Sequence, residues 1–535
     1  MAYNLETYQD PFWAKSGNFV RGRDPLGVQN SSISVYATLL PGMTNLTLRL
    51  RYYGMYLWLL DEYHNLPSDS PFKQSPKAQY TFIRRAELIT AFLMVNNHPN
   101  ELSVIGNDFA NRNILEAKEK GFYDIALGAD QNKDTEKGSV YWDYGSGALG
   151  QYYAGSLFAL NLADSKNGYF ERTEEYGRIL AESYRKSLSK NAEVLFLKRI
   201  NEGKLYLDDL ELMDEIALNK EYKDTPEGEF YFKMLLSDDG LKSKTASQKI
   251  TSQRKESLQL FLNLINDGDE NLNIYELPLS SYSACLKKNK DEVSEASFGW
   301  YYYYLNELAH HSLEAVFWGM LREMDLRSYS LEKFLSEITK KVSNNSKILL
   351  GEHTESLISD LIPSLDRDKF ITLNYIDSID DSVKREDGIE GILQGVFTLL
   401  SLYRDNQHKL NDVRFYVNDH FLDSKYGNAL QIFHNYIETS QGLRFKDFVR
   451  KFIQTLLNEH IAVAYNKMGN GEKNLLKFVV EDNYLVHIET MRPNFTNPRL
   501  RTLLNFTRDL GLVSPENELT ESGKELLIEL NTGNE

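Results

Sequence analysis

The feature that most constrains the fold is helical periodicity, which recurs along the chain with few proline interruptions. Segments such as Met43–Tyr63, Trp300–Met324 and Gly388–Tyr403 are apolar over helical lengths. Only 13 prolines occur in 535 residues, and hydrophobic residues make up 42% of the chain, enough to bury substantial cores. Because this length exceeds that of one ordinary core, the sequence predicts a mainly α, multidomain protein.

Three regions are expected from the order of these patterns. Residues 1–190 form an N-terminal helical region that ends in a winged-helix-like element, and residues 191–404 form a central helical region. Residues 405–535 form a C-terminal region with a winged-helix domain. Within it, Asn474–Val480 and Tyr484–Ile488 have the composition of two short strands, so a small β-hairpin is expected there.

Cysteine usage and hydropathy bear on the compartment. The single cysteine, Cys285, excludes an intramolecular disulfide and fits a reducing cytoplasm. The first residues have neither a basic nor an apolar segment of the kind that starts a secretion signal. The longest apolar runs, such as Met55 to Leu60, are far shorter than a membrane span. We therefore expect a cytoplasmic protein without membrane contact.

The net charge of −17 disfavours diffuse binding to nucleic acid over the whole surface. The charge is uneven, however. Residues 441–511 carry 11 basic and 7 acidic side chains, a local net charge of +4. A local basic face on this part of the chain is therefore compatible with phosphate contact.

The strongest pattern begins at Pro498, where a helix is expected to run to Leu510. A wing-like loop follows Gly511, and Thr520 would cap a closing helix. This order is similar to that of winged helix-turn-helix domains, whose helix before the wing often enters the DNA major groove. The expected apolar face comprises Leu500, Leu503, Leu504, Thr507 and Leu510.

Four residues of the same helix are the candidate DNA-binding residues. Arg501, Asn505 and Arg508 follow helical spacing on the outward face, and Arg499 lies near its start. Arginine and asparagine suit phosphate or base contacts. The alternative is that the same fold docks another protein, as winged helices in multi-subunit machines do.

A second copy of this pattern is expected in Gly150–Glu182. Here Leu162 and Thr173 take the places of Leu512 and Thr520. The interval between the two positions is 11 instead of 8, which predicts a longer wing.

A G-x-G-x-x-G sequence, Gly145 to Gly150, overlaps this copy and follows a candidate strand, Val140–Tyr144. Rossmann domains use such glycines to bring pyrophosphate to a helix N-terminus. The alternating strands and helices of that fold are missing around it, so a flexible turn before a helix is the preferred interpretation. No cofactor is expected.

Two further clusters have structural and functional interpretations. Glu307, His310 or His311, and Glu314 share one helical stripe, but the second half of a di-iron site is missing, so no metal is expected. Basic and aromatic residues interleave in a second cluster, which either stacks on bases or joins helices internally. This cluster consists of Arg49, Arg51, Tyr52, Tyr53, Tyr56, Arg84 and Arg85.

Several short motifs together resemble proteins of bacterial anti-phage defence operons, of the Menshen type or related multi-gene systems. These motifs are Arg51-Tyr52-Tyr53, the glycine-rich turn into Gln151-Tyr152-Tyr153, and the paired endings that begin at Thr173 and Thr520. The resemblance implies an accessory or sensing subunit that works beside an ATPase or nuclease subunit.

The functional prediction is a non-enzymatic subunit of an antiviral defence complex that senses or positions DNA. Its expected partners are protein subunits of the same operon and double-stranded DNA, and it is a candidate for self-association. One alternative is a scaffold that binds only protein. The other is an enzyme with a metal-dependent site around Glu307, His310 and Glu314.

Overall fold

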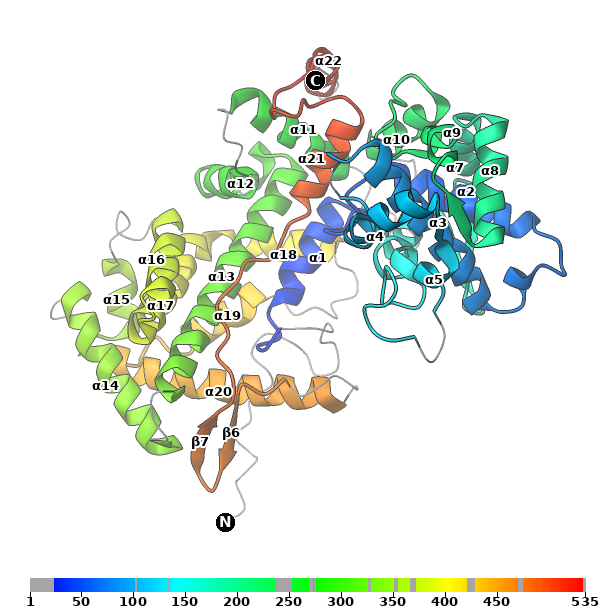
Figure 1. Ribbon diagram of the computed structural model, residues 1–535. Coiled ribbons are helices and arrows are strands. Elements are labelled where there is room, and N and C mark those ends of the chain that lie inside the picture. The colour runs from blue at the N-terminus through cyan, green and yellow to red at the C-terminus, as the bar shows by residue number, and fades with distance from the viewer. Residues whose placement is uncertain are drawn as a thin grey trace. The chain divides into compact units, whose positions relative to one another are not determined.

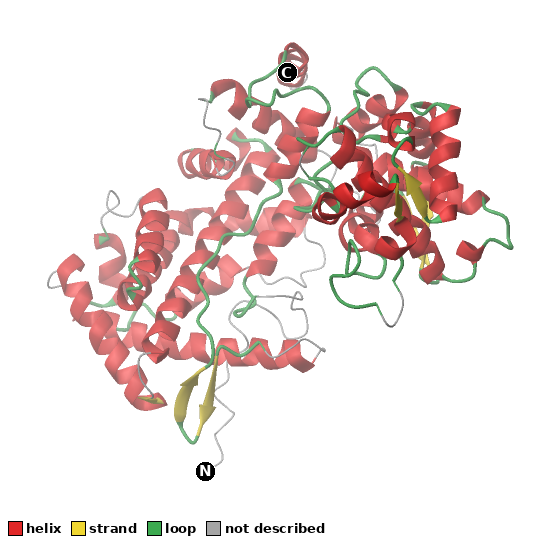
Figure 2. Ribbon diagram, viewed as in Figure 1, coloured by secondary structure: helices red, strands yellow, loops and turns green. Residues whose placement is uncertain are grey.

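The computed structural model describes residues 24–101, 103–131, 135–236, 253–268, 273, 276–325, 329–350, 355–365, 372–420, 429–469 and 475–532. In these ranges helices predominate, and the strands are short and antiparallel (Figure 2). The predicted mainly α fold is therefore confirmed. None of the described helices combines the length and apolar character needed to span a bilayer.

Contacts group the chain into two units, and each unit combines two stretches that are separated in the sequence. Unit 1 comprises Met1–Tyr36 and Leu277–Asn497, and unit 2 comprises Ala37–Glu276 and Pro498–Glu535. The expected C-terminal region is therefore divided: residues up to Asn497 belong to unit 1, and residues from Pro498 onward belong to unit 2. The regional boundaries expected near residues 190 and 404 stay a prediction.

Unit 1 is built around the long helix α13 (Figure 1). Its described helices are most of α1 (Gln29–Leu39), α12 (Glu276–Lys287), the 3-10 turn Lys290–Glu292, α13 (Glu295–Asp325), α14 (Leu331–Leu350), α15 (Ile358–Ser364), α16 (Thr372–Lys384), α17 (Gly388–Asn406), the 3-10 turn Gln407–Lys409, α18 (Leu410–His420), α19 (Ala429–Glu438) and α20 (Phe445–Gly469). Its strands are β5 (Tyr329–Ser330), β6 (Phe478–Glu481) and β7 (Tyr484–His487).

Helices α13 and α17 pack at very close range because glycines remove side chains from their contact. Gly388, Gly391 and Gly395 follow helical spacing and lie on one face of α17. A Cβ atom on Gly391 would lie 2.5 Å from the ring of Trp318, and one on Gly395 would lie 2.7 Å from the carbonyl oxygen of Ser312. Only glycine permits this approach of the two helices.

The expected hairpin is present. β6 and β7 pair antiparallel, with Val480 opposite Leu485, and β5 adds to the other edge of β7. Asp482 and Asn483 both adopt left-handed backbone angles, with φ of 48° and 71°. Two such residues match the twist of a tight hairpin turn, and Asp and Asn tolerate them better than most residues.

Unit 2 carries a helical layer with three short pairs of strands or bridges. Its described elements are α2 (Arg51–Asn65), the 3-10 turn Pro71–Lys73, α3 (Pro76–Asn97), α4 (Asn107–Lys120), β1 (Phe122–Asp124), α5 (Ile125–Ala129), the π-helical turn Leu149–Tyr153, α6 (Ala154–Ala159), β2 (Ala163–Lys166), β3 (Tyr169–Arg172), α7 (Gly177–Lys186), α8 (Lys190–Glu202), β4 (Lys204–Tyr206), α9 (Asp209–Leu212), the 3-10 turn Asp214–Ile216, α10 (Pro226–Leu236), α11 (Gln253–Asp267), α21 (Leu500–Asp509) and α22 (Glu521–Thr532). β1 pairs with β4, β2 with β3, and Val513 bridges to Leu519.

The start of α2 differs from the sequence prediction. The helix begins at Arg51, whereas the apolar segment that predicted it starts at Met43. Thr44 instead forms a local turn with Thr47. The amide of Leu50 donates to the carboxylate of Asp509 at 3.0 Å, so a residue 459 positions away supplies the acceptor. A long-range partner of this kind leaves no local signal in the sequence.

Two segments of unit 2 share one local structure. In the first, α6, the β2–β3 hairpin and α7 follow one another; in the second, α21, the Val513–Leu519 bridge and α22 do. The hydroxyls of Thr173 and Thr520 lie 3.2 Å from the carbonyl oxygens of Leu162 and Leu512, respectively. Each of these hydroxyls also accepts the amide of a glycine in the closing helix. The second copy expected from the sequence therefore has the same local geometry, while the winged-helix assignment itself stays a prediction.

Candidate functional site

Helix α21 packs against the rest of unit 2 through its apolar face. All five residues expected on that face, Leu500, Leu503, Leu504, Thr507 and Leu510, are buried. Phe506 adds an edge-to-face contact with Tyr53 of α2, with ring centroids 5.9 Å apart. At the N-terminal end, the hydroxyl of Thr502 donates to the carbonyl oxygen of Thr44 at 2.7 Å. These contacts fix which residues of α21 face outward.

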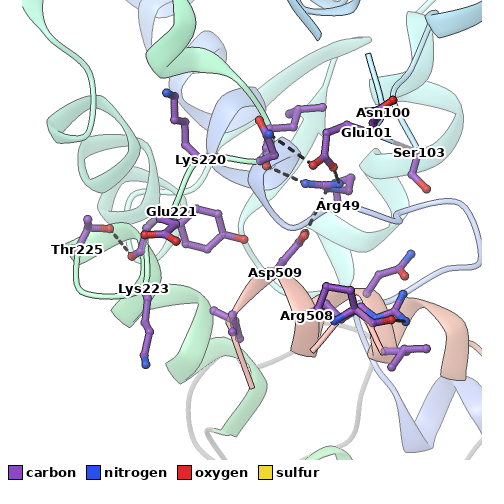
Figure 3. Close-up of a pocket in the computed structure, with 18 of the residues that line it drawn as sticks. Arg49, Asn100, Glu101, Ser103, Lys220, Glu221, Lys223, Thr225, Arg508 and Asp509 are labelled. Atoms are coloured by element: carbon purple, nitrogen blue, oxygen red, sulfur yellow. Dashed lines mark hydrogen bonds and ion pairs between the residues drawn. The ribbon is translucent and has the colours of Figure 1, made fainter. Parts of the chain in front are cut away.

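The outward face of α21 forms one wall of a pocket of about 810 Å³ (Figure 3). The other walls come from the loop after α3 and from the segment between Leu218 and Thr225. The charged lining residues are Arg49, Glu101, Lys220, Glu221, Lys223, Asp224, Arg501, Arg508 and Asp509. Five of these are basic and four are acidic, so the lining has a small positive excess inside an acidic protein.

An ion-pair network forms part of this wall. The guanidinium of Arg49 lies 2.8 Å from Glu101 and 3.4 Å from Asp509, and it also donates to the carbonyl oxygen of Leu218. Figure 3 shows Glu101 and Asp509 on either side of Arg49. Arg49 therefore offsets one of these two carboxylate charges, and the four other basic residues of the lining outnumber the three remaining negative charges by one.

Burial perturbs the carboxyl group of Asp509. Loss of hydration raises its pKa to about 6, although Arg49 and the amide of Leu50 favour the ionised form. For Arg49, burial lowers the pKa, and the charges of Asp509 and Glu101 more than offset that effect and raise it. A carboxyl group with a strongly shifted pKa in a pocket is typical of a functional site, although structural ion pairs show such shifts too.

Arg508 braces the loop that follows α21. One nitrogen of its guanidinium donates to the carbonyl oxygen of Pro515 at 2.9 Å and to the side chain of Asn517 at 2.7 Å. Asn517 has a left-handed φ of 69°. The Nε atom of Arg508 is buried and has no hydrogen-bond partner among the described residues.

The four predicted DNA-binding residues have different environments. Arg499 precedes α21 with a left-handed φ of 65° and donates to the carbonyl oxygen of Leu40. Arg501 is exposed and Asn505 half-buried, and neither makes a hydrogen bond or ion pair within the described residues. Arg501, Asn505 and Arg508 line the pocket, whereas Arg499 does not.

The sequence prediction missed the opposite wall. Lys220 lies 2.5 Å from Asp214, and Lys223 donates to the hydroxyl of Ser522 at 2.6 Å. Asn219 donates to His98 and Glu101, and its Oδ1 atom is buried without a hydrogen-bond partner among the described residues. These residues lie about 280 positions before α21, so no local pattern could associate them with it.

The interleaved basic and aromatic residues of α2 and α3 have internal roles. Tyr52, Tyr53 and Tyr56 are fully buried. Arg51 donates to the carbonyl oxygen of Ala217 and lies 3.4 Å from Glu227. Burial therefore excludes base stacking on the three tyrosines, and the structural interpretation, in which such residues join helices, is correct for them and for Arg51.

The G-x-G-x-x-G turn is also bound internally. Residues 140–144 do not form the candidate strand. The fully buried carboxylate of Glu87 accepts the amides of Ala148 at 3.1 Å and Leu149 at 2.8 Å. A dinucleotide phosphate would need such amides. Because an internal carboxylate already occupies them, the interpretation as a flexible turn is replaced by that of a tightly anchored one.

Glu307, His310 and Glu314 form a buried cluster in unit 1. The imidazole of His310 lies 2.8 Å from Glu307 and 3.0 Å from Glu314. Burial lowers the pKa of His310, but the two carboxylates outweigh burial and raise it well above the usual range. Glu314 and Glu307 also accept the backbone amides of Asn494 and Thr496. The cluster thus fastens an extended segment to α13, and no metal-binding group of three or more His, Cys, Asp or Glu side chains occurs in the described ranges.

The pocket beside α21 combines guanidinium, ammonium and amide donors. Guanidinium groups present planar, paired donors that fit phosphate oxygens, and lysine supplies a compact charge. Such a set suits recognition of an anionic ligand. Comparison with protein-family models, with curated proteins and with solved structures finds no match for this chain.

Proposed function

We propose that this chain is a cytoplasmic, non-enzymatic subunit of a bacterial antiviral defence complex, and that it binds DNA at the pocket beside α21. The observation that carries the proposal is the convergence of Arg501, Asn505 and Arg508 on one pocket with Lys220 and Lys223. Three residues of α21 and two residues of a segment far from it in the sequence thus line the same pocket. The partners we propose are an ATPase or nuclease subunit of the same operon.

Charge balance favours an anionic ligand at this place. Glu101 and Asp509 share Arg49, which offsets one of their two negative charges inside the wall. Arg501 has no acidic partner among the described residues, and Lys223 donates to the neutral hydroxyl of Ser522. These two cations are available for phosphate groups, which supply most of the affinity in protein–DNA complexes.

DNA affinity of the full chain tests the proposal. Fluorescence anisotropy with a labelled oligonucleotide between 50 and 200 mM salt should show binding that weakens with salt. Arg501→Ala should lower the slope of log affinity against log salt by about 0.7 to 0.9, because one phosphate contact is lost. Arg501→Glu should weaken binding further.

Lys198→Glu is the matched control, since Lys198 is a well-exposed cation on α8 that does not line the pocket. The same charge change there should leave the slope unaltered. Absence of DNA binding at 50 mM salt, or equal affinities for the wild type and Arg501→Glu, would refute the proposal. Retention of a protein partner by a chain that binds no DNA would support the scaffold alternative.

We do not propose a metal-dependent enzyme, because the side chains of the cluster around His310 bind one another and the backbone of the same unit. Both carboxylates of that cluster accept backbone amides of the segment that covers α13. Association with the proposed ATPase or nuclease is tested by co-expression of the whole operon and purification of the complex. A chain that turned over a substrate alone and bound none of these products would refute the subunit role.

A further inference from the structure

The outward face of α21 is recessed, which bears on the form of DNA that reaches it. A helix with its side chains is about 10 to 12 Å across, and the major groove is about 12 Å wide. A helix that reads the groove must therefore stand clear of its surroundings. Here, Asn100, Glu101, Ser103 and residues 218–225 line the same pocket as α21. A volume of about 810 Å³ lies in the range of small-ligand sites.

Four residues of the pocket lining also carry a buried polar atom without a hydrogen-bond partner among the described residues: Arg49 (Nε), Asn219 (Oδ1), Tyr222 (the hydroxyl) and Arg508 (Nε). The Nε atom of Arg508 is a buried donor, and the Oδ1 atom of Asn219 is a buried acceptor, and neither has a hydrogen-bond partner among the described residues. Buried polar atoms nearly always have a hydrogen-bond partner, so these atoms are hydrogen-bonding groups that the described fold does not use. The side-chain amide of Asn505 also lines the pocket; it is half-buried and makes no hydrogen bond within the described residues.

A comparison of α21 with α6, the corresponding helix of the first helix–hairpin–helix segment, shows which polar side chains the two helices do not share. The amide of Leu162 donates to Leu157, as the amide of Leu512 donates to Thr507, so these residues correspond. By the same spacing, the positions of Asn505 and Arg508 correspond to Gly155 and Phe158 in α6. The donors of α21 are therefore not a requirement of the shared local fold.

From these observations we infer that the pocket takes one unpaired nucleotide of a DNA strand. Its base lies against the side-chain amide of Asn505, and its phosphates lie against Arg501 and Lys223. Side-chain amides pair well with base edges, and unpaired strands expose the edges that a duplex hides. This inference rests on the proposed function and specifies which part of the DNA is recognised.

The experiment compares four labelled probes of one sequence with the full chain: a single strand, a blunt duplex, and duplexes with a 3′ or a 5′ overhang. The single strand and at least one overhang should bind at least tenfold more tightly than the blunt duplex. Equal binding of blunt and overhanging duplexes would overturn the inference while leaving DNA binding intact. Failure of all four probes would overturn both proposals.

Two substitutions separate base from phosphate recognition. Asn505→Ala should reduce single-strand affinity severalfold without changing the salt slope, whereas Arg501→Ala should lower that slope by about 0.7. Lys198→Glu should change neither. A change in salt slope for Asn505→Ala, or none for Arg501→Ala, would contradict the assignment. An unlabelled deoxynucleoside monophosphate should compete only weakly with the strand, and equal competition at equal concentration would overturn a strand as the natural ligand.

Discussion

Gly177 and Gly523 meet the same obstacle in two separate segments of unit 2. A Cβ atom on Gly177 would lie 2.0 Å from the carbonyl oxygen of Leu162, and one on Gly523 would lie 2.1 Å from that of Leu512. A backbone oxygen cannot rotate aside as a side chain can. Glycine therefore allows α7 and α22 to approach the chain that leaves α6 and α21, respectively, and both segments depend on the same local contact.

Replacement of either glycine by alanine should destabilise unit 2. We expect Gly177→Ala and Gly523→Ala each to lower the free energy of unfolding by about 1 to 3 kcal/mol, because the added methyl group displaces backbone. Gly155→Ala is the matched control, since nothing lies within 4 Å of its Cβ position in α6. It should raise stability by up to about 1 kcal/mol. Urea unfolding measures all three variants, and a tolerated alanine at Gly523 would contradict the steric argument.

The contact of α13 with α17 leads to a similar prediction for unit 1. Gly391→Ala should destabilise the protein by about 1 to 3 kcal/mol, because its methyl group would meet the ring of Trp318. Gly442→Ala places a methyl group where nothing lies within 4 Å and should change stability little. Thermal unfolding of the two variants checks the difference. Equal melting temperatures would show that α17 can shift away from α13 at no cost.

Local features of the fold could be predicted from the sequence because their causes are local. The hairpin follows from two strand-like runs around Asp482 and Asn483, which accept left-handed angles. The end of α21 follows from Gly511, with a φ of 66°. The start of α2 could not be predicted, because the amide of Leu50 next to it donates to Asp509, which lies far along the chain. The assembly of each unit from two separated stretches has the same cause.

The candidate site was predicted in part. Helical spacing identified the face of α21 with Arg501, Asn505 and Arg508, and these three residues do line one pocket. Spacing could not show that Arg499 turns to Leu40 or that Arg508 is used to hold the loop after α21. The opposite wall, with Asn219, Lys220 and Lys223, depends on tertiary packing alone. The amino-acid composition of that segment did not indicate that it lines the site.

Removal of His310 should expose the cost of the buried cluster in unit 1. His310→Ala leaves the carboxylates of Glu307 and Glu314 buried without their shared cation, so we expect a loss of about 3 to 5 kcal/mol. The segment from Asn494 to Thr496 should exchange its amide hydrogens faster, because those amides donate to the same carboxylates. Hydrogen exchange at these amides measures the effect. Unchanged protection would show that other contacts hold this segment in place.

The carboxyl group of Asp509 should make stability depend on pH in an unusual direction. Its pKa in the folded protein is about 6, above the ordinary value of 3.8. Between these two values the folded state binds more protons than the unfolded state, so the contribution of this group to the free energy of unfolding falls as pH rises from about 4 to about 6. Asp509→Asn removes the titration and keeps an oxygen that can accept the amide of Leu50. The stability of the wild type relative to this variant should therefore decrease over that interval, by at most about 3 kcal/mol.

Urea unfolding of both proteins at pH 4, 5, 6 and 7 measures this difference, since groups that both proteins share cancel in it. The groups that face Asp509 are Arg49, Glu101 and the amide of Leu50, and all three remain in the variant. Asp224→Asn is the control, because it removes an exposed carboxylate from the same pocket and should alter stability by no more than about 0.5 kcal/mol at any of these pH values. If the wild type instead gained stability relative to Asp509→Asn as pH rose, the ion pair with Arg49 would outweigh burial, and Asp509 would be ionised throughout this range.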